Sequence, residues 1–201
     1  MEFVRTDKLK DEADTRHQVS LVFVEGFYSL LKVFGKDKTR LIKAFEHMFD
    51  LSKFYVAVND GEIVSLCGVD NGKSKPVALN LDILRKHLGR LRGRWAFWML
   101  NKFIVNKIYP VDIPSNYGTI EFVSAKPSFT GKGITKSLMT HVMGKLDYAG
   151  FILEVLGDNT RAIKLYEKLG FSEIHRVKGP KFSGIDSIMY MKYEKTPEGL
   201  T

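Results

Sequence analysis

The sequence predicts an α/β fold with a mixed, mostly antiparallel twisted sheet of about six or seven strands and helices on both faces. Two observations support this fold class. Short runs rich in Val, Ile and Tyr first follow one another around a tight turn and then alternate with amphipathic helices. The segment 133–146, between two of the later strands, is long enough for a crossover helix, which indicates a parallel strand pair.

The N-terminal third predicts two helices followed by a hairpin. Apolar residues recur at helical spacing over Thr15–Phe34 and Lys38–Phe49. Strands are predicted at Phe54–Asn59 and Glu62–Val69, on either side of Asn59-Asp60-Gly61. Because Asn, Asp and Gly tolerate positive φ, this tripeptide suits a tight hairpin turn.

The rest of the chain alternates helices and strands. Helices are expected at Leu79–Leu88 and Leu91–Ile108, and Pro110 and Pro114 then precede a strand at Gly118–Ala125. The later elements are a helix at Gly133–Leu146, a strand at Phe151–Leu156, a helix at Asn159–Leu169, and strands near Ser172–Val177 and Asp186–Tyr193.

Length and composition favour a single domain over residues 1–201, because 201 residues with 44% apolar content can bury one substantial core. No apolar run approaches the roughly 20 residues that cross a bilayer, and the N-terminus lacks a signal-peptide pattern.

Cys67 is the single cysteine and is expected to be a packed side chain, which suits a reducing cytoplasm. The scattered histidines predict no metal site. We expect a loose tail at 196–201 and either a monomer or a homodimer.

The net charge of +8 is concentrated in residues 71–110, which we call the basic insertion. This segment has nine Lys and Arg residues against Asp82, whereas the rest of the chain has 22 basic and 22 acidic residues. Such a field attracts RNA, the ribosome, another acidic partner or an anionic substrate, and a solvated helix face is the alternative. Its aromatic residues, including Trp95 and Trp98, are expected in the core or around an acceptor pocket.

The segment Pro127–Lys136 predicts an anion site. Its sequence, Pro-Ser-Phe-Thr-Gly-Lys-Gly-Ile-Thr-Lys, ends a strand, turns at Gly131 and Gly133, and begins a helix. Unpaired N–H groups at a helix start bind anions, and glycines let a phosphate approach the main chain. The expected ligand is a diphosphate. The pattern is neither a Walker loop nor a dinucleotide fingerprint, since Lys136 replaces the third glycine, and an ordinary turn is the alternative.

A second motif, Leu153–Phe171, joins a strand, a polar turn, a helix and a glycine stop. Its sequence is Leu-Glu-Val-Leu-Gly-Asp-Asn-Thr-Arg-Ala-Ile-Lys-Leu-Tyr-Glu-Lys-Leu-Gly-Phe. In this order and spacing, the two motifs resemble the GNAT family of acyl-CoA N-acyltransferases over roughly Tyr117–Val177. The resemblance implies the acyl-CoA N-acyltransferase fold, with a splayed parallel strand pair at the cofactor site. It also implies direct acetyl transfer from acetyl-CoA to a primary amine of unknown identity, without a metal.

The resemblance implies a cofactor site on the first motif. The family pattern Arg/Gln-x-x-Gly-x-Gly/Ala falls on Thr130, Gly133 and Thr135, so two of the three marked positions depart from it. By the resemblance, the strand before the loop lies beside the pantetheine arm, and the Val123 amide polarises the acetyl carbonyl. The implied cofactor-binding residues are Val123, Ala125, Thr130, Gly131, Lys132, Gly133, Ile134, Thr135, Lys136 and Asn159. Lys132 and Lys136 supply charge, and Asn159 is also expected to cap a helix.

Three residues are candidates for the chemistry. Tyr166 is expected to protonate the departing thiolate, or else to pack in the core. The base is Glu121 or Glu154, and we prefer Glu121 because it shares a strand face with Val123. Glu154 precedes Tyr166 by twelve residues, like the base and acid of the ribosomal-protein N-terminal acetyltransferase branch. Each carboxylate could instead be a solvent-facing partner of a lysine.

The departures at Thr130 and Thr135 motivate an alternative function. In it, the chain keeps the fold, has lost turnover, and binds RNA or another acidic partner through the basic insertion.

Overall fold

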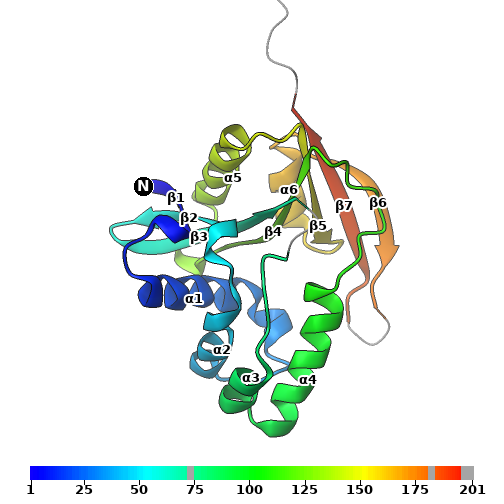
Figure 1. The fold of residues 1–201 in the computed structure, drawn as a ribbon. Coiled ribbons are helices and arrows are strands. Elements are labelled where there is room, and N and C mark those ends of the chain that lie inside the picture. The colour runs from blue at the N-terminus through cyan, green and yellow to red at the C-terminus, as the bar shows by residue number, and fades with distance from the viewer. Residues whose placement is uncertain (72–74, 181–183, 196–201) are drawn as a thin grey trace, which may run out of the picture.

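The computed structural model describes residues 1–71, 75–180 and 184–195. Their strands form a seven-stranded sheet in the order β1-β2-β3-β4-β5-β7-β6 (Figure 1). Neighbouring strands are antiparallel except β4 and β5, which are parallel. The mixed, mostly antiparallel sheet that the sequence predicts is therefore confirmed.

The strands are β1 (Glu2–Arg5), β2 (Phe54–Asn59), β3 (Glu62–Asp70), β4 (Tyr117–Ala125), β5 (Gly150–Leu156), β6 (Ser172–Lys178) and β7 (Ser187–Glu194). The helices are α1 (Glu12–Leu31), α2 (Lys38–Phe45), α3 (Leu81–Leu88), α4 (Arg90–Leu100), α5 (Ile134–Lys145) and α6 (Thr160–Glu167). Strand β1 was not predicted, because four residues are too few to show alternation. It pairs with β2 at the sheet edge.

The predicted helix Leu91–Ile108 is wrong in its second half. Helix α4 ends at Leu100 and a π-helical turn follows at Asn101–Val105. The Asn101 side chain donates to the Phe97 carbonyl, and the Asn106 amide bonds Asn101 five residues back. The helical segment ends at this wider turn, and the chain then continues toward β4. The second predicted helix is also shorter, since a 3₁₀ turn replaces its end at Glu46–Met48.

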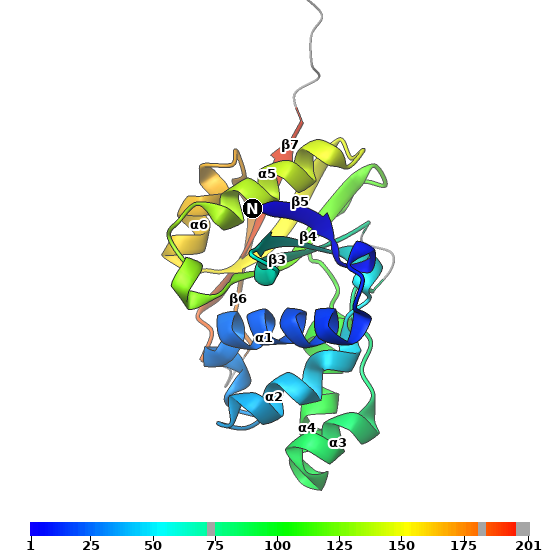
Figure 2. The ribbon, with the colours of Figure 1, turned by 90° about the vertical axis from the view of Figure 1, so that its left-hand side faces the viewer.

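Helices cover both faces of the sheet. Figure 2 shows α5 on one side and α1 on the other, with α2, α3 and α4 beyond α1. On the α1 side, the ring of Phe23 makes edge contacts with Phe45, Phe49 and Phe122. On the other side, the fully buried Met139 of α5 belongs to a second core. The basic insertion thus extends the α1 side of the molecule.

The predicted loose tail at 196–201 and Lys73 of the basic insertion lie outside the described residues. Among the helices that the structure describes, none has the length and apolar character of a membrane span.

Candidate active site where strands β4 and β5 part

The parallel pair β4–β5 is hydrogen-bonded along only part of its length. Pairing begins at Tyr117 opposite Gly150 and ends at Ile120 opposite Leu153. Beyond that point, β4 continues to Ala125 along β3, while β5 continues to Leu156 along β7. The splayed pair that the resemblance implies is therefore present.

A bulge marks the place where the strands part. In the β3–β4 register, Leu66 lies opposite Ser124 and Gly68 lies opposite Glu121. The two residues Phe122 and Val123 of β4 therefore lie opposite the single residue Cys67 of β3. Phe122 has a φ of 54°, a left-handed conformation that is rare for a bulky residue. Such a bulge bends its strand and interrupts pairing. The backbone around Val123 is thus irregular where the resemblance places a carbonyl-binding amide.

The glycine turn before α5 has the features of an anion site. Gly131 and Gly133 have φ values of 82° and 78°, and no described side chain caps the helix that begins at Ile134. The first N–H groups of α5 therefore have no capping acceptor among the described side chains, and the positive end of the helix dipole lies at this turn. A Cβ built on Gly131 would lie 3.6 Å from the Arg161 guanidinium of α6. Arg161 is a nearby cation that the sequence analysis missed, because its motif gave no sign that α6 begins beside this turn.

The two residues that depart from the family pattern have structural partners. The Thr130 hydroxyl donates to the Lys126 carbonyl at 3.1 Å. The Thr135 hydroxyl lies 3.1 Å from the hydroxyl of the buried Ser65 on β3. These bonds tie the turn to the sheet, and Lys132 and Lys136 remain exposed beside it.

On the opposite face of the sheet, both candidate bases contact one lysine. Lys107 Nζ lies 3.1 Å from Glu121 Oε1 and 3.0 Å from Glu154 Oε1. The side chains of Lys107, Glu121 and Glu154 are 14%, 12% and 32% exposed, respectively. The sequence alternative, in which each carboxylate pairs with a lysine, is therefore present. Its solvent-facing position is wrong for Glu121, because this side chain is mostly buried. Because Ile120 and Leu153 belong to the core under α5, their neighbours Glu121 and Glu154 point to the other face.

Two tyrosines complete this cluster. Tyr109 donates to Glu121 Oε1 at 2.6 Å, and its ring packs edge-on against Tyr190 of β7 with centroids 5.9 Å apart. The Lys107 ammonium also lies 4.5 Å from the centre of the Tyr109 ring. The sequence analysis missed Lys107 and Tyr109, because they lie in a connection without a periodic pattern.

Burial and charge fix the protonation states in the cluster. Burial acts to lower the pKa of Lys107, but attraction to Glu154 and Glu121 outweighs it and raises the pKa. Burial, followed by the charge of Glu121, raises the pKa of Tyr109, and burial and Glu154 raise that of Tyr190 to about 12. Lys107 is therefore an ammonium at neutral pH, and both tyrosines are neutral phenols.

Tyr166 lies on the α5 side of the sheet. It is buried in the same core as Met139, and its ring centroid is 6.0 Å from that of Phe171. Burial raises its pKa, with a smaller contribution from Cys67, so the phenol keeps its proton. Burial also raises the pKa of Cys67 to about 12, which keeps it a thiol and fits the expected packed side chain.

Asn159 caps α6 as expected, since its side chain accepts a hydrogen bond from the Ala162 amide at 3.1 Å. Gly170 ends the helical segment with a φ of 91°, and Phe171 returns to the core.

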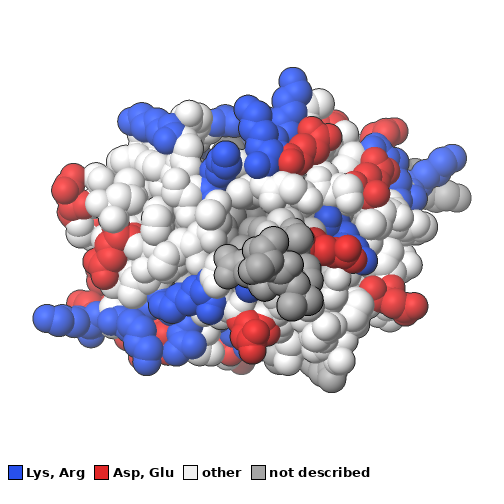
Figure 3. Space-filling model, turned by 90° about the horizontal axis from the view of Figure 1, so that it is seen from above, with Lys and Arg blue, Asp and Glu red and all other residues white. Residues whose placement is uncertain are grey.

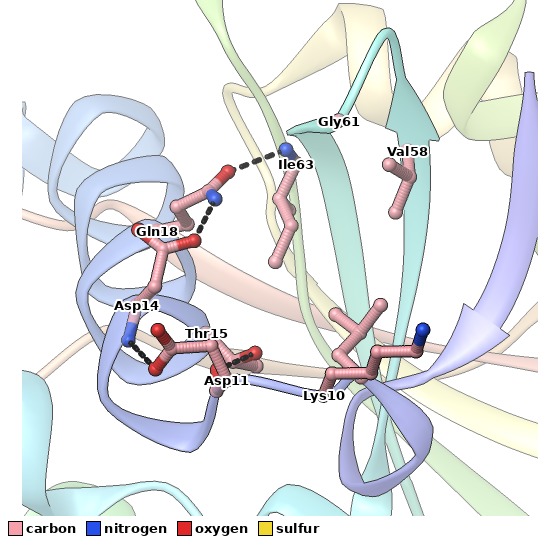
Figure 4. Close-up of a pocket in the computed structure, with 9 residues that line it drawn as sticks. Lys10, Asp11, Asp14, Thr15, Gln18, Val58, Gly61 and Ile63 are labelled. Atoms are coloured by element: carbon pink, nitrogen blue, oxygen red, sulfur yellow. Dashed lines mark hydrogen bonds between the residues drawn. The ribbon is translucent and has the colours of Figure 1, made fainter.

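A small pocket of about 140 Å³ lies elsewhere, between the start of α1 and the β2–β3 hairpin (Figure 4). Ligand pockets usually measure about 300–1,000 Å³. The polar groups here serve the fold, because Asp11 caps α1 and Gln18 accepts from the Ile63 amide at 2.7 Å. This pocket is therefore not the candidate site. No cluster of three or more His, Cys, Asp or Glu suited to a metal occurs in the described part of the chain.

Solved structures share this architecture. An N-acetyltransferase from Staphylococcus aureus Mu50 superposes with a TM-score of 0.62 at 14% identity, covering 96% of this chain and 100% of that one. The ribosomal-protein-S18-alanine N-acetyltransferase from Escherichia coli gives a TM-score of 0.54 at 14% identity, covering 100% and 98%. At these identities the comparison establishes the fold.

Sequence comparison goes further. The [ribosomal protein bS18]-alanine N-acetyltransferase of Salmonella typhimurium (strain LT2) is 33% identical over 78 residues, which are 36% of this chain and 53% of that protein. The match thus spans about half the length of this curated relative. The model of the acetyltransferase (GNAT) family matches residues 24–171, more than half of the chain and including both motifs. The chain therefore belongs to the acetyltransferase (GNAT) family.

Proposed function

We propose that this protein transfers the acetyl group of acetyl-CoA to a primary amine. The observation that carries the proposal is the position of the glycine turn and the uncapped start of α5 beside the parted strands β4 and β5. The turn offers N–H groups and flanking cations to a diphosphate, and the parted strands offer main-chain groups to the pantetheine arm. Membership of the family supports this combination.

In this proposal the diphosphate of coenzyme A binds at residues 130–136, with Lys132, Lys136 and Arg161 contributing positive charge. The Thr135 hydroxyl is bonded to Ser65, which supports a role in holding the turn. Ala125 bonds the pantetheine, and Asn159 contacts the pantetheine or the thioester end of the cofactor.

The chemistry proceeds by direct attack. Glu121 or Glu154 removes a proton from the acceptor ammonium, and the free amine attacks the thioester carbon. The N–C bond forms, the Val123 amide stabilises the oxyanion of the tetrahedral intermediate, and the attacking nitrogen releases its second proton to solvent before the C–S bond breaks. Tyr166 then donates its phenolic proton to the departing thiolate. Burial raises the pKa of this phenol further above the thiol value of about 8.5, so the transfer requires Tyr166 to be held close to the sulfur, and the phenolate then regains a proton from solvent.

A peptide N-terminus is the first acceptor to test, because the relative from Salmonella typhimurium is named for acetylation of an alanine on a ribosomal protein. We place the protein in the cytoplasm, as a reducing compartment suits its buried free thiol.

Isothermal titration with acetyl-CoA and free coenzyme A tests the proposal. We expect binding to the wild type and none to Gly133→Trp, whose bulky side chain would occupy the turn. Gly61→Trp is a matched control, because Gly61 also has positive φ and open surroundings but lies on the β2–β3 hairpin. Absence of acetyl-CoA binding to the wild type would refute the proposed activity.

A second candidate function rests on the exposed face of α4. Trp98 is 56% exposed, and Arg90, Arg92 and Arg94 are exposed on the same helix. The Lys102 ammonium lies 5.2 Å from the Trp98 ring centre. The expected core position is therefore wrong for Trp98. Interleaved cations and aromatic rings favour binding of RNA or another acidic partner, and such binding is compatible with acetyl transfer.

A further inference from the structure

The connection from the π-helical turn to β4, residues 106–116, crosses the sheet on the side away from α5. We call this segment the strap. Figure 1 shows it rising from α4 past β7 to the start of β4. Lys107 contacts Glu121 of β4 and Glu154 of β5, and Tyr109 packs on Tyr190 of β7. The strap therefore covers the sheet where β4 and β5 part.

The Lys107 ammonium lies at a chemically significant point. Glu121 and Glu154 immediately follow the last hydrogen-bonded pair, Ile120 and Leu153. Lys107 Nζ is 3.0–3.1 Å from both carboxylates. A general base takes a proton from a group at this distance. A primary amine thus already occupies the position between the two candidate bases, on the face opposite Tyr166.

We propose that Lys107 occupies the place of the acceptor amine, so that the strap must withdraw it before an external amine can react. This inference rests on the proposed acetyltransferase function and deepens it in two ways. It identifies the acceptor as a primary ammonium, and it makes the strap an autoinhibitory contact.

Lys107 fills this position as an ammonium, because the two carboxylates raise its pKa. When the strap withdraws, the carboxylates lose their countercharge, which an entering ammonium restores. A neutral or anionic acceptor would leave two partly buried carboxylates unpaired, so the site selects cations.

The strap's described contacts suit such withdrawal. Lys107 and Tyr109 point to the sheet, whereas Ile108 between them is 88% exposed. The strap is thus docked here by alternate side chains, and Tyr109 reinforces the docking through its bond to Glu121.

Truncation of Lys107 with added alkylamines tests the inference. Lys107→Ala removes the equivalent of n-propylamine, and Lys107→Gly that of n-butylamine. With acetyl-CoA present, we expect each variant to acetylate its length-matched amine at least about tenfold faster than the wild type, because the vacated position holds the amine for attack. Mass spectrometry of the N-acetylated alkylamine measures this. Lys8→Ala, which truncates an exposed lysine near the N-terminus, should match the wild type.

Tyr109→Phe provides a second test should the truncated variants fail to fold. It keeps Lys107 and removes the hydrogen bond that docks the strap to Glu121. We expect acetylation of external n-butylamine to increase about tenfold, as expected for loss of a hydrogen bond to a charged group. An unchanged or lower rate in Tyr109→Phe would overturn the inference.

Measurement of acetyl-CoA binding separates the inference from the proposed function. If acetyl-CoA does not bind the wild type, the proposed function itself fails. If acetyl-CoA binds and a peptide amine is acetylated, but folded Lys107→Ala handles n-propylamine no faster than the wild type, the inference alone is wrong. Thermal stabilisation of Lys107→Ala by n-propylammonium without acetylation would also overturn it, because the position would then bind an amine without presenting it for reaction.

Discussion

At the residue scale, the first question is whether Tyr166 acts as a general acid or only packs in the core. We predict that Tyr166→Phe lowers kcat by about 10²-fold, within the usual range for loss of a general acid, while acetyl-CoA binding stays unchanged. The ring and its contact with Phe171 are retained, so thermal stability should change little. Steady-state kinetics and thermal denaturation of the purified variant measure the two effects. A normal kcat with lower stability would assign Tyr166 to packing alone.

His47 should make stability depend on pH. Its Nε2 accepts from the Asn80 amide at 2.8 Å, which requires an unprotonated nitrogen, and burial lowers its pKa below the ordinary value. Because the folded-state pKa is the lower one, this contribution to stability is present above the unfolded-state pKa of about 6.5 and is lost as pH falls through the folded-state pKa.

Urea unfolding at pH 7.5 and 5.5 measures that contribution. We expect the free energy of unfolding to decrease more for the wild type than for His47→Gln, whose amide oxygen remains an acceptor at both pH values. The nearby His87, whose pKa burial also lowers, titrates in both proteins and largely cancels from the difference. Equal pH dependence in the two proteins would contradict the assignment.

The residues of the site differ in how far sequence could reveal them. Glu121 and Glu154 could be identified from their places on predicted strands and their spacing from a motif. The expected shared face of Glu121 and Val123 is wrong, because the bulge at Phe122 places Val123 against the core under α5, whereas Glu121 points to the other face. Lys107 and Tyr109 lie in an aperiodic connection, where a buried lysine has the same sequence signature as a solvated one. Their positions depend on where the strap crosses the sheet, which is a tertiary property. The roles of the cofactor-binding residues stay predictions.

At the element scale, Gly93 sets the approach of α4 to α3. A Cβ built there would lie 2.6 Å from the Arg85 backbone, whereas one on Gly144 of α5 meets nothing within 4 Å. We predict that Gly93→Ala destabilises the protein by about 1–3 kcal/mol through overpacking. Gly144→Ala should stabilise it by about 0.5–1 kcal/mol, because alanine favours a helix interior. Chemical denaturation compares them, and equal changes of the same sign would refute the close approach.

The elements that the sequence predicted correctly carry local signals. The hairpin between β2 and β3 follows from Asn59-Asp60-Gly61, and Asp60 and Gly61 do adopt positive φ. The end of α4 could not be predicted, because residues 101–108 keep an apolar helical pattern. The π-helical turn ends the helix there, and Lys107 and Tyr109 beyond it make contacts with β4, β5 and β7.

At the scale of the whole molecule, the charge is distributed unevenly. Figure 3 views the end away from α3 and α4, where basic and acidic side chains are interspersed. The basic insertion at the other end has nine basic residues and one acidic residue in sequence. We therefore expect a polyanion to bind at the α3–α4 end, whereas the proposed cofactor site lies on separate elements. This separation allows the two candidate functions to be tested independently.

We predict that single-stranded RNA binds the α4 face at low salt and that the affinity decreases as salt increases. Each neutralised phosphate contributes a slope of about −0.7 in log K against log salt concentration. Trp98→Ala should weaken binding at every salt concentration through lost stacking, whereas Arg94→Glu should also reduce the slope. Lys8→Glu is a matched charge reversal outside this face. Fluorescence anisotropy with labelled RNA measures both the affinity and its slope against salt concentration.

Titration with acetyl-CoA then determines whether the two ends act separately. Both α4 variants should bind acetyl-CoA like the wild type, because the glycine turn at residues 130–136 is held by α5, β3 and β4, not by α4. Wild-type protein that shows no RNA binding even at low salt would remove the motive for the second function. The exposed cations would then be a solvated helix face, and acetyl transfer would stand alone as the proposed role of the chain.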